Sequence, residues 1–177
     1  MNEWIDELSD VAASGEPAVL VTVAAIRGSA PREVGAKMIV TATQTIGTIG
    51  GGQLEYQSTR IAAGMLESRE LIVRPFPLGS SMGQCCGGVV DILFEPIGDG
   101  YPAWLRDLTA LHGQQIPAVV ATHLSAAAPA KVVITASEVY GDDVADEALV
   151  VRGRDLLENR ATAFRDDHFF YEPIVIA

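Results

Sequence analysis

Apolar residues recur along this chain in two spacings, which predict helices and strands. A helical spacing marks residues 2–14, Gln53–Ser68 and Pro102–Leu111. Apolar, β-rich runs predict strands at Ala18–Ile26, Lys37–Thr41, Thr45–Ile49, Glu70–Phe76, Val89–Phe94, Ile116–Thr122 and Lys131–Thr135. After Val139 the pattern weakens, and it predicts a turn at Gly141–Asp143, a short helix at Asp155–Arg160 and a strand at Ala163–Tyr171.

Helices and strands that are mixed without strict alternation predict an α/β or α+β fold. We expect one mixed β-sheet flanked by helices. The 177 residues fit a single domain that spans residues 1–177. With 49% hydrophobic and 20% charged residues, the composition is typical of a compact folded protein. No internal repeat is visible in the sequence.

The net charge of −11 argues against nucleic acid or an anionic membrane surface as a partner. The charge is uneven, because Pro17–Val90 holds six basic residues and four acidic ones. A locally basic, glycine-rich stretch in an acidic protein predicts a small anionic ligand. The acidic N-terminus lacks a long apolar run, so we expect no export signal and a cytoplasmic protein.

The two cysteines of the chain, Cys85 and Cys86, are adjacent in a glycine-rich segment. Neighbouring Cα atoms lie about 3.8 Å apart, below the span of about 4.4–6.8 Å that disulfides usually bridge. We therefore expect two free thiols on exposed backbone, where thiolate could serve as a soft metal ligand or in sulfur chemistry. A role as small core residues remains the alternative. The histidines do not have the spacing of a zinc site.

Two other segments could bind an anion. The segment Arg27–Lys37 places Arg32 and Lys37 on glycine-interrupted backbone, and such groups bind phosphate. In the segment Gly47–Glu55, three glycines between a strand and a helix could turn their N–H groups toward an anion. Glu55 could accept hydrogen bonds from a ligand. Alternatively, its negative charge could only interact favourably with the positive end of the helix dipole.

In this order, the three segments resemble the N-terminal domain of the XdhC/CoxI family. The matching strings are Gly28–Arg32, Gly35–Met38, Gly47–Glu55, Phe76–Gly79, Gly83–Gly88 and Phe94–Pro96. The resemblance covers residues 17–96 and is weaker over residues 97–177 of the same domain. Members of this family usually continue into a Rossmann-like C-terminal domain. This chain ends about where that domain would begin, so we expect either a truncated or a naturally short member.

The resemblance implies an accessory protein, or chaperone, for molybdenum hydroxylases such as xanthine dehydrogenase. Such a protein binds molybdenum cofactor (molybdopterin) as cargo and assists its sulfuration and insertion into the apo-enzyme, with a cysteine desulfurase as a possible sulfur donor. We expect a maturation factor without catalytic residues rather than a turnover enzyme, and a homodimer. The alternatives are a thiol-dependent transferase or reductase that uses Cys85 and Cys86, and a protein–protein interaction module.

The cofactor has a phosphate tail, a pterin with an N–H edge and a soft metal centre. Arg32, Lys37 and the backbone of Gly50–Gly52 suit the phosphate, and Glu55 or Gln84 suits the pterin edge. Cys86 or Cys85 suits the molybdenum or a sulfur in transit, and we assign Cys86 to the metal. The candidate cofactor-binding set is Arg32, Lys37, Gly50, Gly51, Gly52, Gln53, Glu55, Gln84, Cys85, Cys86, Gly87 and Gly88.

Overall fold

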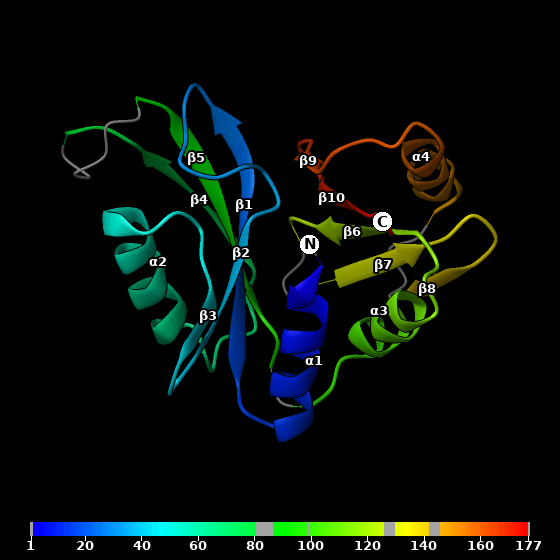
Figure 1. Ribbon diagram of the computed structural model, residues 1–177, viewed down its shortest axis with the longest axis horizontal. Coiled ribbons are helices and arrows are strands. Elements are labelled where there is room, and N and C mark those ends of the chain that lie inside the picture. Colours follow the sequence, from blue (N-terminus) through cyan, green and yellow to red (C-terminus); the bar gives the residue numbers. More distant parts are fainter. Residues whose placement is uncertain (1, 81–86, 99, 126–129, 142–145, 177) are drawn as a thin grey trace.

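A computed structural model describes residues 2–80, 87–98, 100–125, 130–141 and 146–176, which form helices and two β-sheets (Figure 1). The helices are α1 (Glu3–Ser14), α2 (Gly52–Gly64), α3 (Ala103–Gly113) and α4 (Glu147–Glu158). The first sheet holds β1 (Ala18–Arg27), β2 (Lys37–Thr41), β3 (Thr45–Gly47), β4 (Ile72–Pro77) and β5 (Val89–Pro96). The second sheet holds β6 (Ala118–His123), β7 (Ala130–Ile134), β8 (Val139–Gly141), β9 (Phe164–Arg165) and β10 (Phe169–Ile174).

The predicted α/β or α+β fold is confirmed as α+β, but the single mixed sheet is wrong because the described residues form two sheets. Each strand pair in the described residues is antiparallel. Helix α2 does not connect two neighbouring parallel strands. The chain leaves it for edge strand β4, which turns back into β5, and β5 pairs antiparallel with β1. The helix between two strands in the sequence is therefore not a crossover between parallel strands. Only the observed strand pairing distinguishes the two cases.

The two sheets have the same topology, which corrects the expectation of no internal repeat. The strand orders are β3-β2-β1-β5-β4 and β8-β7-β6-β10-β9. Each sheet is built by one helix, three strands, a second helix and two strands, in that order along the chain. We call residues 2–98 the first half and residues 100–176 the second half. The repeat was missed in the sequence because the residues that the halves share are few and scattered.

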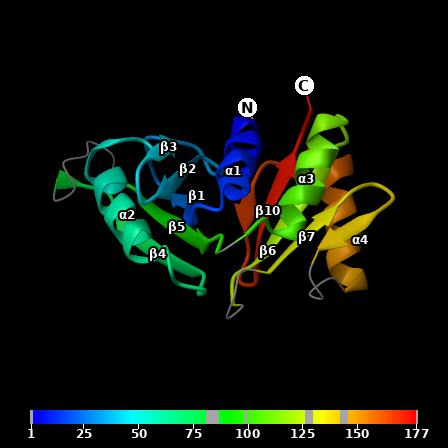
Figure 2. The ribbon, with the colours of Figure 1, turned by 90° about the horizontal axis from the view of Figure 1, so that it is seen from below.

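Helix α2 covers the outer face of the first sheet, and α4 covers the outer face of the second (Figures 1 and 2). The inner faces of the two sheets are turned toward each other. Leu54 and Ala62 of α2 pack on the outer face of the first sheet, and Leu149 of α4 packs on the second sheet. Helices α1 and α3 lie side by side between the sheets (Figure 2). One shared core joins the halves through residues of both helices and both inner faces, namely Ile5, Leu8, Leu20, Ile39, Leu105, Leu108, Val120 and Val133.

Most predicted elements of the first half are confirmed, whereas the end of the second half was predicted poorly. Helix α4 begins at Glu147, and its N-terminus is capped by the Asp146 side chain, which accepts from the Leu149 N–H at 2.8 Å. The expected helix at Asp155–Arg160 covered only its last turn. The helix contains Gly153, which lies so close to Ile134 that a Cβ there would overlap it. A glycine required by packing thus hid a helix whose local pattern is weak.

Because the core is shared, we predict that Leu108→Ala destabilises both halves together. The side chain is fully buried, and its truncation should lower the free energy of unfolding by about 2–5 kcal/mol. Urea unfolding, monitored by circular dichroism and by tryptophan fluorescence, would measure this change in the free energy of unfolding. The matched control Val151→Ala removes a side chain that is 61% exposed and should change stability by less than about 0.5 kcal/mol. Two separate transitions in Leu108→Ala would contradict the single-domain prediction.

Candidate functional site

The three segments singled out in the sequence meet at one end of the first sheet. The loop between β1 and β2 lies in the middle and contacts both others. On one side, the Gly88 N–H donates to the Ser29 carbonyl oxygen at 3.1 Å. On the other side, the Arg32 guanidinium donates to the Thr48 carbonyl oxygen at 3.2 Å. The β4–β5 connection, which carries the cysteines in sequence, is closed at its base by a bond from the Leu78 N–H to the Gly88 carbonyl oxygen at 2.7 Å.

Gly88 has a structural reason to be glycine. A Cβ there would lie closer than 3.0 Å to the carbonyl oxygens of Ser29 and Arg27, a separation that real Cβ atoms do not adopt. The glycine therefore allows the backbones of two motif segments to touch. Gly87 differs, because a Cβ there would meet no atom of the described residues within 4 Å. Of the two candidate glycines, Gly87 is the one with space beside it.

The glycine turn before α2 does form an anion nest, and Glu55 fills it. Its Oε2 atom accepts from the Gly51 N–H at 2.8 Å and the Ile49 N–H at 3.1 Å, and also from the Thr48 hydroxyl. Partial burial favours the neutral acid, but these hydrogen bonds outweigh it and lower the pKa of Glu55. The carboxylate is therefore ionised at neutral pH and occupies the position that we assigned to a phosphate.

The Arg32 side chain links the β1–β2 loop to the segment Gly47–Glu55. Its Nε and Nη2 atoms donate to the two carboxylate oxygens of Glu33 at 3.2 and 3.0 Å, in addition to the bond to Thr48. The hydrogen bonds from Arg32 lower the pKa of Glu33, so this neighbour is also ionised. The guanidinium charge is thus already matched by a carboxylate in this structure.

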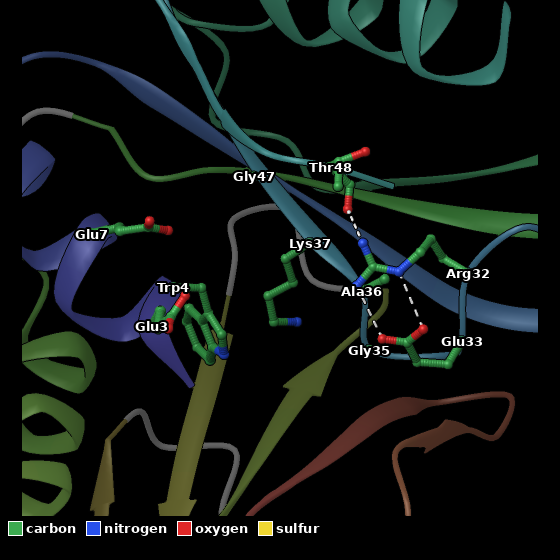
Figure 3. A pocket seen from close by; sticks show the side chains of 10 residues that line it. All are labelled: Glu3, Trp4, Glu7, Arg32, Glu33, Gly35, Ala36, Lys37, Gly47 and Thr48. Atoms are coloured by element: carbon green, nitrogen blue, oxygen red, sulfur yellow. Dashed lines mark hydrogen bonds and ion pairs between the residues drawn. The ribbon is translucent and has the colours of Figure 1, made fainter. Parts of the chain in front are cut away.

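A pocket of about 230 Å³ opens between this loop and α1 (Figure 3). Its charged lining groups are three carboxylates and two basic groups, from Glu3, Glu7, Glu33, Arg32 and Lys37. The indole of Trp4, on the α1 side, also lines the pocket (Figure 3). The locally basic stretch of the sequence does not produce a basic pocket, because folding places the acidic helix α1 against it.

Lys37 is buried in the pocket wall and is already paired. Its side chain is only 4% exposed, and its ammonium lies 2.9 Å from Glu172 Oε2 and 3.1 Å from the Thr22 hydroxyl. It also lies 5.0 Å from the centre of the Trp4 ring. Burial lowers the pKa of Lys37, and attraction to Glu172 opposes that effect. The proposed contact between Lys37 and a phosphate stays a prediction.

The remaining candidates fall in two groups. Gly52 and Gln53 are exposed at the start of α2, and Gly87 is exposed at the base of the cysteine segment. Gln84, Cys85 and Cys86 lie outside the described residues. Within the described ranges, no group of three or more His, Cys, Asp or Glu side chains is arranged to hold a metal ion.

Sequence reasoning missed Trp4, Thr22 and Glu172, which surround the Lys37 ammonium. Glu172 lies 135 positions from its partner and belongs to the second half. The available signal was a repeated pattern. Trp4 and Thr22 have counterparts in Trp104 and Thr122, and the string Phe-Glu-Pro-Ile at residues 94–97 returns as Tyr-Glu-Pro-Ile at residues 171–174.

Comparison with known proteins supports the resemblance. Residues 11–76 match the XdhC and CoxI family, which confirms the recognition over that segment. A crystal structure of a xanthine dehydrogenase from Bacillus halodurans has a similar fold, with a TM-score of 0.72 and 19% sequence identity. The superposition covers 96% of this chain and 52% of that one, so this chain spans about half its length. The search of curated proteins found no match.

No helix in the described ranges is long and apolar enough to cross a membrane.

We predict that Gly88→Ala separates the two motif segments and destabilises the protein. The added Cβ would overlap the backbone of the β1–β2 loop, and such overpacking costs about 1–3 kcal/mol. The neighbouring variant Gly87→Ala is the control, because its Cβ would contact none of the described residues within 4 Å. Equal free energies of unfolding in urea for the two variants would contradict the close approach.

We predict that Glu55→Gln removes a pH-dependent part of the stability. A carboxylate whose pKa is lowered by folding stabilises the protein above its unfolded pKa, and this contribution is lost as the pH falls through the folded value. The variant should lose about 1 kcal/mol at pH 7 and approach the wild type in acid. Glu67→Gln, on an exposed turn, is the control. An equal difference at both pH values would show that Glu55 does not act through its charge.

Proposed function

We propose that this chain, which carries an XdhC and CoxI family segment at residues 11–76, is an accessory protein for the maturation of a xanthine dehydrogenase-type enzyme. In this role it binds molybdenum cofactor as cargo, assists its sulfuration and passes it to the apo-enzyme. The observation that carries the proposal is the meeting of the three motif segments at one end of the first sheet, joined by bonds at Ser29, Thr48 and Gly88.

The chemistry of the pocket favours the pterin over the phosphate. Glu3, Glu7 and Glu33 are carboxylates on or near its rim, and carboxylates accept hydrogen bonds from an N–H edge. The two basic groups are matched by Glu33 and Glu172, so little positive charge is left for an anion. We therefore propose that the pterin edge meets this pocket.

The phosphate would bind at a different place, the glycine turn before α2. The anion nest before α2 is occupied by Glu55, so a phosphate there has to displace that carboxylate. The neighbouring backbone of Gly52 and Gln53, at the exposed start of the helix, can then contribute N–H groups to it. Displacement of an internal carboxylate would make binding weaker and release easier, which suits a protein that hands its cargo on.

Cys86, with Cys85, is proposed to meet the molybdenum or a sulfur in transit, because thiolate is a soft ligand. The proposed partners are a molybdenum hydroxylase apo-enzyme and a cysteine desulfurase that donates sulfur. We further propose a homodimer and a cytoplasmic location.

Metal and pterin analysis of protein purified from a cofactor-producing host tests the proposal. We expect molybdenum and pterin to copurify with the wild type in equal amounts. Cys86→Ala should retain less molybdenum than Cys85→Ala, since residue 86 adjoins Gly87, which has space beside it for a bulky ligand. Absence of both cargo components from the wild type would overturn the proposed function. Unimpaired retention in both variants would instead remove the cysteines from it.

A further inference from the structure

The two halves repeat one buried polar cluster as well as one topology. In the first half, Lys37 begins β2 within the string Ala-Lys-Met-Ile-Val-Thr at residues 36–41. In the second half, Lys131 lies near the start of β7 within the string Ala-Lys-Val-Val-Ile-Thr at residues 130–135. The Lys37 ammonium donates to Thr22 and lies over Trp4, and the Lys131 ammonium donates to Thr122 and lies over Trp104.

The carboxylate of each cluster comes from the opposite half. Lys37 pairs with Glu172 of β10 at 2.9 Å, and Lys131 pairs with Glu95 of β5 at 2.7 Å. The four side chains are between 2% and 11% exposed. The two ion pairs are reciprocal, as they would be across a two-fold interface between identical subunits.

The halves differ where the motif segments lie. The connection between β4 and β5 runs over residues 78–88, whereas its counterpart between β9 and β10 is the short turn at residues 166–168. The first half has a glycine turn before α2, and the second half has a side-chain cap at Asp146 before α4. The second half thus keeps the scaffold and lacks the glycine-rich segments.

We propose that the second half acts as a scaffold for the first, and that Glu172 is a positioning residue for the β1–β2 loop of the candidate site. This deepens the proposed function and rests on it for its consequence in cargo binding. Glu172 is the charged group through which the second half reaches the loop, beside the apolar contacts of Ala163 and Phe170. Its carboxylate binds Lys37, and a Cβ at Gly35 would lie 3.5 Å from its Oε2 atom.

Glu172 can position the loop because the charge of Lys37, which it pairs with, is buried. An ammonium that is only 4% exposed is costly to leave unpaired, so the start of β2 is stable where Glu172 can reach it. The loop that ends there is fixed to β1 by bonds from the Gly35 N–H to the Val23 carbonyl oxygen at 2.8 Å and from the Val23 N–H to the Ala36 carbonyl oxygen at 2.9 Å. Glu95 performs the same pairing for Lys131 and reaches Lys37 only as a weaker, longer-range charge.

The duplication supplies a matched control. We compare Glu172→Gln with Glu95→Gln, since each breaks one of two equivalent pairs, and follow amide hydrogen exchange in the full chain. In Glu172→Gln the Gly35 amide should exchange about tenfold faster than in Glu95→Gln, as expected for loss of a charge-assisted partner. The amides of β7 should show the reverse. Equal acceleration at Gly35 in both variants, or none in either, would overturn the proposal.

If a single variant does not fold, the double variants Lys37→Met/Glu172→Gln and Lys131→Met/Glu95→Gln replace it, because removal of both charges leaves none unpaired. In the double variants the contrast at Gly35 should keep its direction but be smaller than tenfold, because the link between the halves is lost without leaving a buried charge unpaired. Faster exchange at Gly35 in the Lys131/Glu95 double variant would overturn the proposal. In a second measurement, molybdenum and pterin retention should fall further with the Glu172 change than with the Glu95 change. A wild type that retains no cargo would reject the proposed function, while the exchange measurement would still decide the role of Glu172.

Discussion

Two buried lysine–glutamate pairs, each formed across the interface between the halves, fix how the two sheets meet. Buried ion pairs stabilise a structure less than their Coulomb attraction suggests, because both charges lose their hydration. They also favour the observed arrangement of the halves, since Lys37 and Lys131 each take a carboxylate partner from the opposite half. The surrounding apolar core of α1, α3 and the inner sheet faces supplies the larger share of the stabilisation.

The candidate site depends on this arrangement in two ways. Its pocket lies between the β1–β2 loop and α1, and α1 is held by the core shared with the second half. Its loop ends at Lys37, whose partner Glu172 belongs to the second half. Residues far from the glycine motifs in sequence therefore shape the surface on which these motifs act.

The glycines and charged residues of the motifs have more internal roles than sequence reasoning predicted. Gly88 allows two backbones to touch, and Glu55 occupies the nest that the glycine turn creates. Arg32 joins the β1–β2 loop to Thr48. The Gly88 and Arg32 interactions link different segments, whereas Glu55 binds the backbone of its own segment. A motif read by itself could not distinguish a ligand-binding residue from one that binds the protein's own backbone.

The sequence by itself limited the fold class to α/β or α+β, and it determined most elements of the first half, the three motif segments and their family resemblance, because these depend on local spacing and residue type. Only the tertiary structure decided the antiparallel pairing, the repeated topology and the partners of Lys37 and Arg32. Strand order and buried ion pairs depend on which distant segments meet. Such contacts are selected by the packing of the whole chain, and they leave little trace in the local pattern of any one segment.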